Sequence, residues 1–187
     1  MSGKDFEKGW SVSGWMIEQL GDGFIKDNGT AISELVKNSY DADATKVIIS
    51  FEKAFSKDLV DSRVSISDNG SGMDKDELDY FFTVGDPHKR KKKENADGEP
   101  FSPVYGRWLH GERGLGRFGL QKLGFYSTVV TRKAGQPTYS FEIDWMKFRE
   151  LENVQDYKIT IKEDDDEWKD AFSGDRTGTM LIVSHLK

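Results

Sequence analysis

The sequence predicts a two-layer α/β sandwich, in which a mixed, mostly antiparallel sheet carries helices on one face. Three observations favour this fold. Twelve Phe, six Tyr and five Trp among 187 residues supply bulk for a hydrophobic core. About six segments have the alternating or β-branched pattern of strands, beside three or four helical segments. The later strands follow one another without helices between them, which favours antiparallel pairing. Because no repeat or linker divides the chain, we expect residues 1–187 to form a single domain.

The first half of the chain alternates between helical and extended patterns. The stretch TKVIISF is rich in β-branched residues and predicts a strand. Thr30 is the expected N-cap of the longest helix, and Asp74 is placed to cap the next one. In chain order we expect a short helix with a loop at residues 10–26, a helix at 30–40, strands at 45–51 and 63–67, and a helix at 75–82.

An irregular segment follows at residues 83–110. It contains three of the four prolines and the basic run HKRKKK at residues 88–93. A loop of this length inside a compact domain is typical of a lid, a binding loop or disorder. The basic run allows two interpretations, a solvated charge patch or a mobile segment near phosphate groups.

The second half of the chain predicts mainly strands. Residues 138–145 alternate strictly between apolar and polar positions, as a half-buried strand does. The last apolar run (GTMLIV) is expected to be fully buried, and the acidic stretch EDDDE to be solvated surface. In chain order we expect a helix at residues 120–123, strands at 125–131, 138–145 and 157–161, an acidic turn at 163–167 and a strand at 178–183.

Composition argues against several classes of protein. The net charge of −6 gives no general attraction to nucleic acid or to anionic membranes. No apolar run is long enough for a membrane span, and the charged N-terminal residues do not form a signal peptide. The chain has no cysteine, which fits a reducing, cytoplasmic compartment, and its three scattered histidines argue against a zinc site.

The stretch ELVKNSYDADA, at residues 34–44, is the most informative in the chain. On a helix, Glu34, Asn38 and Asp41 fall at i, i+4 and i+7, so their polar groups share one narrow face while apolar residues occupy the other side. That face could supply a base for activating water and a carbonyl oxygen for a hard cation. The alternative is an amphipathic helix whose polar side simply faces solvent.

Two glycine-rich segments add candidate ligand contacts. The segment GERGLGRFG, at residues 111–119, could bring backbone N–H groups close to phosphate oxygens before a helix. It fails the P-loop pattern because Arg117 and Phe118 stand where Lys and Ser or Thr are needed, and it does not follow a strand as a dinucleotide fingerprint should. In DNGSGM, Asp68 could accept a hydrogen bond from an exocyclic amine beside glycines that leave room for a flat ring. The alternative for residues 111–119 is tight packing alone, and the alternative for DNGSGM is an ordinary turn.

These segments, with the Gly178–Thr179 pair that opens the last strand, occur in the order of a known family. They resemble the ATP-binding domain shared by DNA gyrase B subunits, heat-shock chaperones, histidine kinases and mismatch-repair proteins, the GHKL or Bergerat fold. The resemblance covers about residues 15–185 and is closest to bacterial Hsp90-like or microrchidia-like ATPases. It implies ATP and ADP as ligands and Mg²⁺ as cofactor.

The resemblance also implies roles for the matching positions. Glu34 is implied as the general base that activates water, and Asn38 as the Mg²⁺ ligand on a face that Asp41 supports. Asp68 is implied to bind the adenine amino group within a network that includes Thr179. The remaining implied nucleotide-binding residues are Gly70, Gly72 and Met73 at the base and Gly114, Leu115, Gly116, Arg117 and Phe118 at the phosphates.

Residues 83–110 are the implied ATP lid. A glutamate four positions before the asparagine favours an ATPase over a histidine kinase. We expect the N-terminal module of a longer protein, in which slow ATP hydrolysis drives a conformational switch and, on ATP binding, dimerisation. The alternatives are a catalytic domain of the histidine-kinase or anti-sigma type and a nucleotide-binding module without turnover. Neither a membrane nor a nucleic-acid partner is indicated.

Overall fold

The computed structural model describes residues 6–9, 11–12, 25–55, 59–84, 101–110, 117–150 and 156–187. The predicted strands and the helices at residues 30–40, 75–82 and 120–123 occur in the predicted order, and elements that were not predicted lie at residues 6–9, 83–84 and 145–150. The strands are β1 (Phe6–Gly9), β2 (Ser11–Val12), β3 (Val47–Glu52), β4 (Arg63–Asp68), β5 (Thr83–Val84), β6 (Gly124–Arg132), β7 (Thr138–Asp144), β8 (Lys158–Glu163) and β9 (Gly178–Leu186). The helices are α2 (Asn28–Asp41), α3 (Lys75–Phe82), α5 (Phe118–Leu123) and α6 (Trp145–Glu150).

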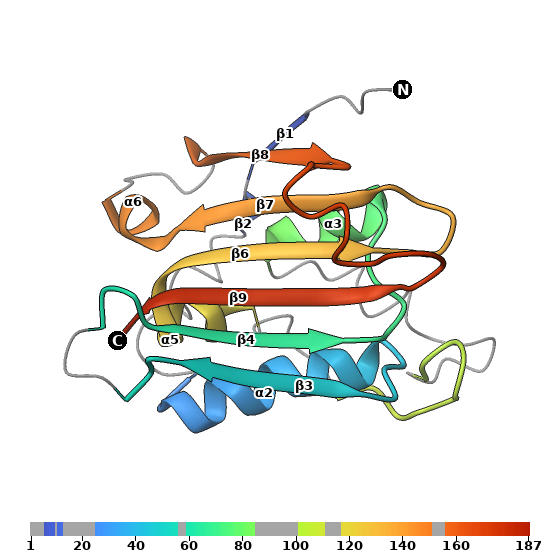
Figure 1. Ribbon diagram of the computed structural model, residues 1–187, viewed down its shortest axis with the longest axis horizontal. Helices are drawn as coiled ribbons and strands as arrows, with labels where there is room; N and C mark the ends of the chain where they lie inside the picture. The colour runs from blue at the N-terminus through green and yellow to red at the C-terminus, as the bar shows by residue number, and fades with distance from the viewer. Residues whose placement is uncertain are drawn as a thin grey trace.

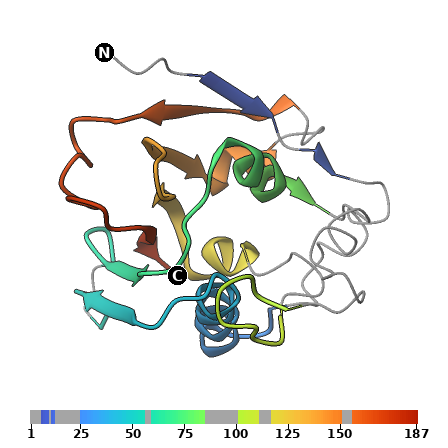
Figure 2. The same ribbon diagram turned by 90° about the vertical axis from the view of Figure 1, so that its right-hand side faces the viewer.

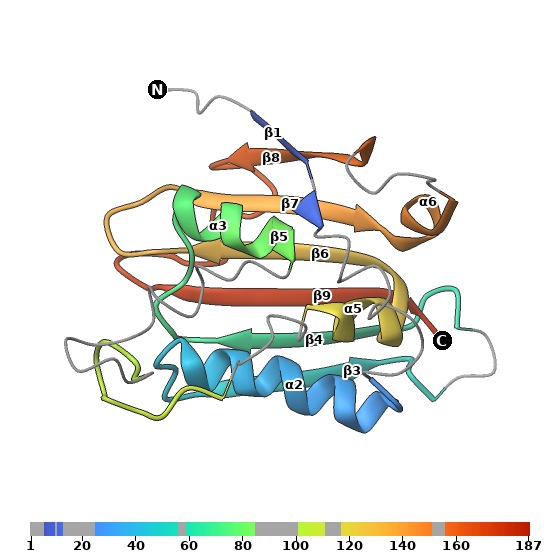
Figure 3. The same ribbon diagram turned by 180° about the vertical axis from the view of Figure 1, so that it is seen from behind.

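One large sheet organises the described residues. Its seven strands run in the order β1-β8-β7-β6-β9-β4-β3, and every neighbouring pair is antiparallel. The short strands β2 and β5 pair in parallel beside it. Helices α2, α3 and α5 cover one face of the sheet (Figures 2 and 3). The predicted two-layer α/β sandwich with helices on one face is therefore confirmed.

The hydrophobic core fills the space between the sheet and these helices. Leu35 of α2, Leu78 of α3 and Leu120 of α5 are all essentially inaccessible to solvent. Trp145 is also fully buried, and its indole N–H donates to the Ser127 hydroxyl at 2.8 Å, so its one polar group is satisfied. Trp145 begins α6 and does not end β7 as predicted. No helix among the described residues is long and apolar enough to cross a membrane.

Local capping signals account for where two helices begin. Helix α3 has the predicted bounds, and Asp74 forms a capping box with Glu77. The predicted N-cap of the longest helix is wrong. Asp27 caps α2 because its carboxylate accepts a hydrogen bond from the amide of Thr30, which places Thr30 inside the first turn.

Two expectations for the later strands are corrected. Strand β9 is longer than predicted, and most of its residues are only half-buried because one face of the sheet carries no helices. The acidic turn is not purely solvated surface, since Glu163 closes β8 in an ion pair with Lys75 at 2.5 Å and Lys162 pairs with Asp165 at 3.0 Å. Of the predicted helix and loop at residues 10–26, positions 10 and 13–24 lie outside the described residues, and residues 11–12 form β2.

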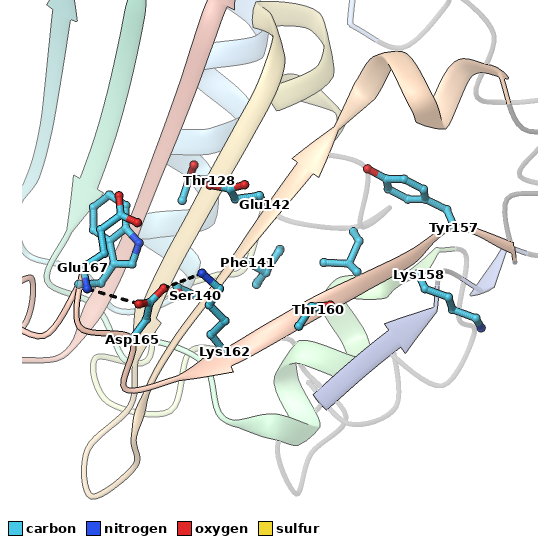
Figure 4. Close-up of a pocket in the computed structure, with 12 residues that line it drawn as sticks. Thr128, Ser140, Phe141, Glu142, Tyr157, Lys158, Thr160, Lys162, Asp165 and Glu167 are labelled. Atoms are coloured by element: carbon cyan, nitrogen blue, oxygen red, sulfur yellow. Dashed lines mark hydrogen bonds and ion pairs between the residues drawn. The ribbon is translucent and has the colours of Figure 1, made fainter. Parts of the chain in front are cut away.

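The connection between β8 and β9 crosses the sheet face that bears no helices (Figure 1). A hollow lies beneath it, with Glu142, Thr160 and Lys162 on its sheet side and Asp165 and Glu167 on the connection (Figure 4). Helix α2 lies on the other face of the sheet (Figures 1 and 3).

Candidate functional site

Helix α2 places its motif residues through close packing against α5. Ala31, Leu35 and Ser39 form its buried stripe. Gly119 of α5 allows the two helices to approach, because a Cβ there would lie 3.0 Å from the Ala31 carbonyl oxygen. The two helices lie side by side on the sheet (Figure 3). With this stripe fixed in the core, the flanking positions of α2 are turned toward solvent.

The three polar residues predicted to share a face of α2 have different surroundings. Asn38 is exposed although its neighbour Ser39 is buried. The Glu34 side chain is 36% exposed and pairs with Lys37 at 2.6 Å. Asp41 accepts a hydrogen bond from the backbone amide of His110 at 2.9 Å. Asp41 therefore anchors a neighbouring loop, while Glu34 and Asn38 are accessible from solvent.

Asp68, the last residue of β4, is the centre of a hydrogen-bonded cluster. Its Oδ2 atom accepts from the Ser39 hydroxyl at 2.8 Å, and its Oδ1 atom accepts from the amides of Gly70 at 2.9 Å and Thr179 at 3.1 Å. Burial raises the pKa of Asp68 above its ordinary value, and these three donors oppose that rise. Asp68 therefore has three hydrogen-bond donors that compensate for its partial burial.

Thr131 joins three segments around Asp68. The Thr131 hydroxyl accepts from the amide of Met73 at 2.9 Å, donates to the carbonyl oxygen of Gly178 at 3.1 Å, and lies 3.0 Å from the Thr179 hydroxyl. Residues 69–73, the end of β6 and the start of β9 are thereby held together. The segment that contains Asp68 and Met73 thus meets Thr179, which is far away in the sequence, at one end of the sheet.

The glycines of the DNGSGM segment allow close packing of the backbone. A Cβ at Gly70 would lie 2.7 Å from the carbonyl oxygen of Ala42, and one at Gly72 only 1.9 Å from that of Arg132. Gly72 also has a φ of +68°, in the left-handed region that favours glycine. A side chain at either position would therefore collide with backbone, so the local packing requires glycine at both. Their place beside a flat ring stays a prediction.

The second glycine segment is described only from Arg117 onward. Gly114, Leu115 and Gly116 lie outside the described residues. The Arg117 side chain is buried and donates to the carbonyl oxygens of Tyr80 at 2.9 Å and Thr83 at 3.4 Å, at the end of α3. Burial lowers the pKa of Arg117 to about 10, which leaves it charged at neutral pH.

The backbone of Arg117 forms the N-cap of α5, and Phe118 is buried with its ring 6.5 Å from that of Trp145. The side chains of Arg117 and Phe118 are therefore committed to packing. Their backbone amides are the groups that remain relevant to the predicted phosphate contacts.

Part of the predicted lid forms a compact loop at the C-terminal end of α2 (Figure 3). Residues 85–100 lie outside the described residues, but residues 101–110 fold around the buried Asp43. This carboxylate accepts from the Ser102 hydroxyl at 2.5 Å and from the amides of Val104 at 2.9 Å and Tyr105 at 3.2 Å. Burial alone would raise the pKa of Asp43, but these hydrogen bonds hold it below its ordinary value.

Arg107 adds a second attachment of the same loop to α2. Its guanidinium donates to the carbonyl oxygen of Ala44 at 2.7 Å and lies 4.8 Å from the ring centroids of Tyr40 and Tyr105. Sequence reasoning missed the roles of Asp43, Ser39 and Thr131. A serine within an otherwise apolar stripe of α2 was a usable signal for Ser39, whereas nothing local marks Thr131.

The described residues contain no group of three or more acidic or histidine side chains that could hold a metal. The exposed carboxamide of Asn38 nevertheless fits a Mg²⁺ ion that takes most of its ligands from phosphates and water, because such ions need only one or two protein ligands.

Comparison with known proteins identifies a family and a related protein. Residues 27–179 match the family described as "Histidine kinase-, DNA gyrase B-, and HSP90-like ATPase". The DNA mismatch repair protein MutL of Dichelobacter nodosus (strain VCS1703A) is 32% identical over 83 residues. These residues make up 44% of this chain and 13% of that protein, so the similarity spans a small part of the relative.

Proposed function

The chain belongs to the family of histidine kinase-, DNA gyrase B- and HSP90-like ATPases, and from this premise we propose that it binds ATP along α2 and hydrolyses it slowly with Mg²⁺. The family accounts for ATP binding in general. The assignment of residues to the nucleotide, the base and the metal is our proposal.

The hydrogen bonding of Asp68 is the observation that carries this proposal. An ionised carboxylate has about four acceptor positions. Three are occupied by Ser39, Gly70 and Thr179, two on Oδ1 and one on Oδ2. One acceptor position on Oδ2 remains within the described surroundings, and it suits the exocyclic amine of adenine. Thr131 links the Thr179 hydroxyl and the Met73 amide, and the Thr179 amide in turn donates to Asp68.

Helix α2 connects this end of the site to the groups proposed for the phosphates. Asn38 is next to Ser39 in the sequence, and Glu34 precedes Ser39 by five residues, about 7.5 Å along the helix axis. We assign the Asn38 side-chain oxygen as the Mg²⁺ ligand. When bound, the ion neutralises phosphate charge. The backbone amides that follow residue 113 would contact the phosphates from the start of α5.

Glu34 is assigned as the base that takes a proton from the attacking water. In the structure its carboxylate pairs with Lys37 on the exposed side of α2. An exposed pair of this kind contributes only about 0–1 kcal/mol, so Glu34 can leave Lys37 and turn toward water at little cost. Asp41 does not act on the reaction directly, because its carboxylate holds the amide of His110.

A pair of variants tests the assignment. Glu34→Ala should abolish hydrolysis and spare ATP binding, since a general base contributes about 10²- to 10⁴-fold to rate. Lys37→Ala is the matched control on the same helix and should retain turnover. If Glu34→Ala hydrolyses ATP at the wild-type rate, Glu34 is not the base. If the wild-type chain and Glu34→Ala both bind ATP and neither releases phosphate, the module acts through nucleotide occupancy alone.

We further propose that ATP occupancy acts as a conformational switch that favours dimerisation.

The turnover of this chain should remain below about 1 s⁻¹, because completed phosphoryl-transfer sites such as those of kinases reach only about 1–100 s⁻¹. A steady-state rate above that value would contradict the proposal of slow hydrolysis.

A further inference from the structure

Strand β3 forms an outer edge of the large sheet and carries large apolar side chains that solvent reaches. It pairs with β4 on one side, and no strand among the described residues pairs with its other side (Figures 1 and 2). Ile48 is 49% exposed, Ile49 38% and Phe51 51%. Edge strands are usually protected by a proline, by a central charge or by a cover, because their free backbone groups recruit other strands. Strand β3 has neither a proline nor a charged residue at its centre.

The pairing with β4 determines which backbone groups of β3 face the free edge. The carbonyl oxygen of Lys46 accepts from the amide of Asn69, its partner across the pair. Residues in an antiparallel pair alternate between facing the partner and facing away. Lys46, Ile48, Ser50 and Glu52 therefore direct their backbone groups toward β4. Val47, Ile49 and Phe51 direct their N–H and C=O groups outward.

The other side of β4 gives the same alternation. Ser62 directs its carbonyl oxygen toward β9, where it accepts from the amide of His185. The odd-numbered residues of β4 therefore face β3, as the Lys46–Asn69 bond requires.

We propose that β3 pairs antiparallel with β3 of a second copy of this chain, about a twofold axis through Ile49. In this register Val47 lies opposite Phe51 of the other copy, and Ile49 lies opposite its own equivalent. All three outward-facing residues then form hydrogen-bonded pairs. The side chains of Lys46 and Glu52 lie on the other face of the sheet, where each Lys46 is directly opposite Glu52 of the other copy.

Charge complementarity favours a second copy in this register over its neighbours. A shift of the axis to Ile48 places Lys46 opposite Ser50, and a shift to Ser50 places Glu52 opposite Ile48. Both shifts lose the two Lys46–Glu52 pairs and leave fewer outward-facing residues paired. Cross-strand pairs of opposite charge stabilise a sheet, and like charges directly opposite each other destabilise it.

The contact rests on a six-residue strand and is small compared with a standard protein interface. We therefore expect weak association, with a dissociation constant between about micromolar and millimolar. It does not depend on the proposed nucleotide site, since β3 lies at the sheet edge and contributes no residue to the Asp68 cluster.

Charge reversal provides the first test. Sedimentation velocity over a concentration series, without nucleotide, should show a reversible dimer of the wild-type chain. K46E and E52K should each weaken it at least tenfold, and the double variant K46E/E52K should restore it. Thermal unfolding of each variant shows that the monomer is folded. A wild-type chain that stays monomeric at about 1 mM overturns the proposal, as does a double variant that associates no better than the single ones.

Cysteine cross-linking provides the second test, because the natural chain has no cysteine. In the proposed register Ile49→Cys brings two sulfurs together at the axis, where paired Cα atoms are about 5.5 Å apart, within disulfide range. Ser50→Cys is the neighbouring control, and its two copies are too far apart to bond. Efficient oxidation of I49C but not of S50C is expected. Equal oxidation of both variants, or of neither, overturns the register. ATP binding by these variants should be unchanged, so failure here leaves the proposed function untouched.

Discussion

Replacing Ser39 by alanine should destabilise the fold through one buried hydrogen bond. The Ser39 hydroxyl donates to the Asp68 carboxylate at 2.8 Å, and Ser39 is only 3% exposed. A hydrogen bond to a charged group contributes about 1.5–3 kcal/mol, and the better helix propensity of alanine returns at most about 0.5 kcal/mol. We expect a net loss of about 1–2.5 kcal/mol. For a domain of this size that lowers Tm by about 2–10 °C.

The loss should depend on pH in a defined direction. Burial raises the pKa of Asp68, and the Ser39 hydroxyl opposes that rise, so Ser39→Ala should raise the pKa further. Compared with the unfolded chain, the folded protein therefore holds the proton of Asp68 more strongly. The stability that this shift contributes is fully present when the pH is below the ordinary aspartate pKa. It is lost as the pH rises through the raised pKa of Asp68 in the folded protein. The difference between the wild-type protein and Ser39→Ala should therefore be largest near neutral pH and shrink on acidification.

A double-mutant cycle with Asp68→Asn isolates the interaction. A neutral amide makes a weaker bond of about 0.5–1.5 kcal/mol, so Ser39→Ala should cost about 1 kcal/mol less in the Asp68→Asn background. Chemical unfolding of the four proteins at pH 7 measures this coupling. A loss below about 0.5 kcal/mol, or one of equal size in both backgrounds, would refute the hydrogen-bonding account of Asp68.

Three further predictions concern other parts of the molecule. Gly72→Ala should destabilise the fold by about 2–4 kcal/mol in chemical unfolding, because its Cβ collides with the end of β6. Gly135→Ala has a similar φ but open space, and should lose only about 1–2 kcal/mol; equal losses would contradict the steric argument. Asp43→Ala should release residues 101–110 from α2, seen as faster amide hydrogen exchange at Val104; unchanged exchange would show that Asp43 does not hold the loop. Because hydrogen bonds lower the pKa of Asp43, its stabilisation is present above the ordinary aspartate pKa and should be lost as pH falls through the lowered value, which a pH series of the same exchange experiment tests.

Elements with local signals could be predicted from the sequence. The helix at residues 75–82 has its predicted bounds because Asp74 and Glu77 form the cap within four residues of each other. The N-cap of the longest helix was predicted wrongly because the sequence offers two suitable residues, Asp27 and Thr30. In the structure Asp27 is the N-cap, and its carboxylate accepts from the amide of Thr30. The burial of β9 was overestimated because an apolar run does not reveal that one sheet face lacks helices.

The sequence pointed to several residues that the structure brings together around Asp68, and much less to the contacts between them. The motifs pointed to Asp68 and Thr179, which the structure joins across 111 positions. The role of Ser39 was missed because its partner lies 29 positions away. The close approach of Gly72 to Arg132 depends on tertiary structure that no local pattern records.

Calorimetric titration with ATP in the presence of Mg²⁺ tests the central proposal most directly. The folded wild-type chain should bind ATP with a measurable heat, whereas Asp68→Asn, which keeps the shape of the carboxylate, should stay folded and bind at least tenfold more weakly. Equal affinity of the two proteins, or no uptake of ATP by the folded wild-type chain, would contradict the account of the site.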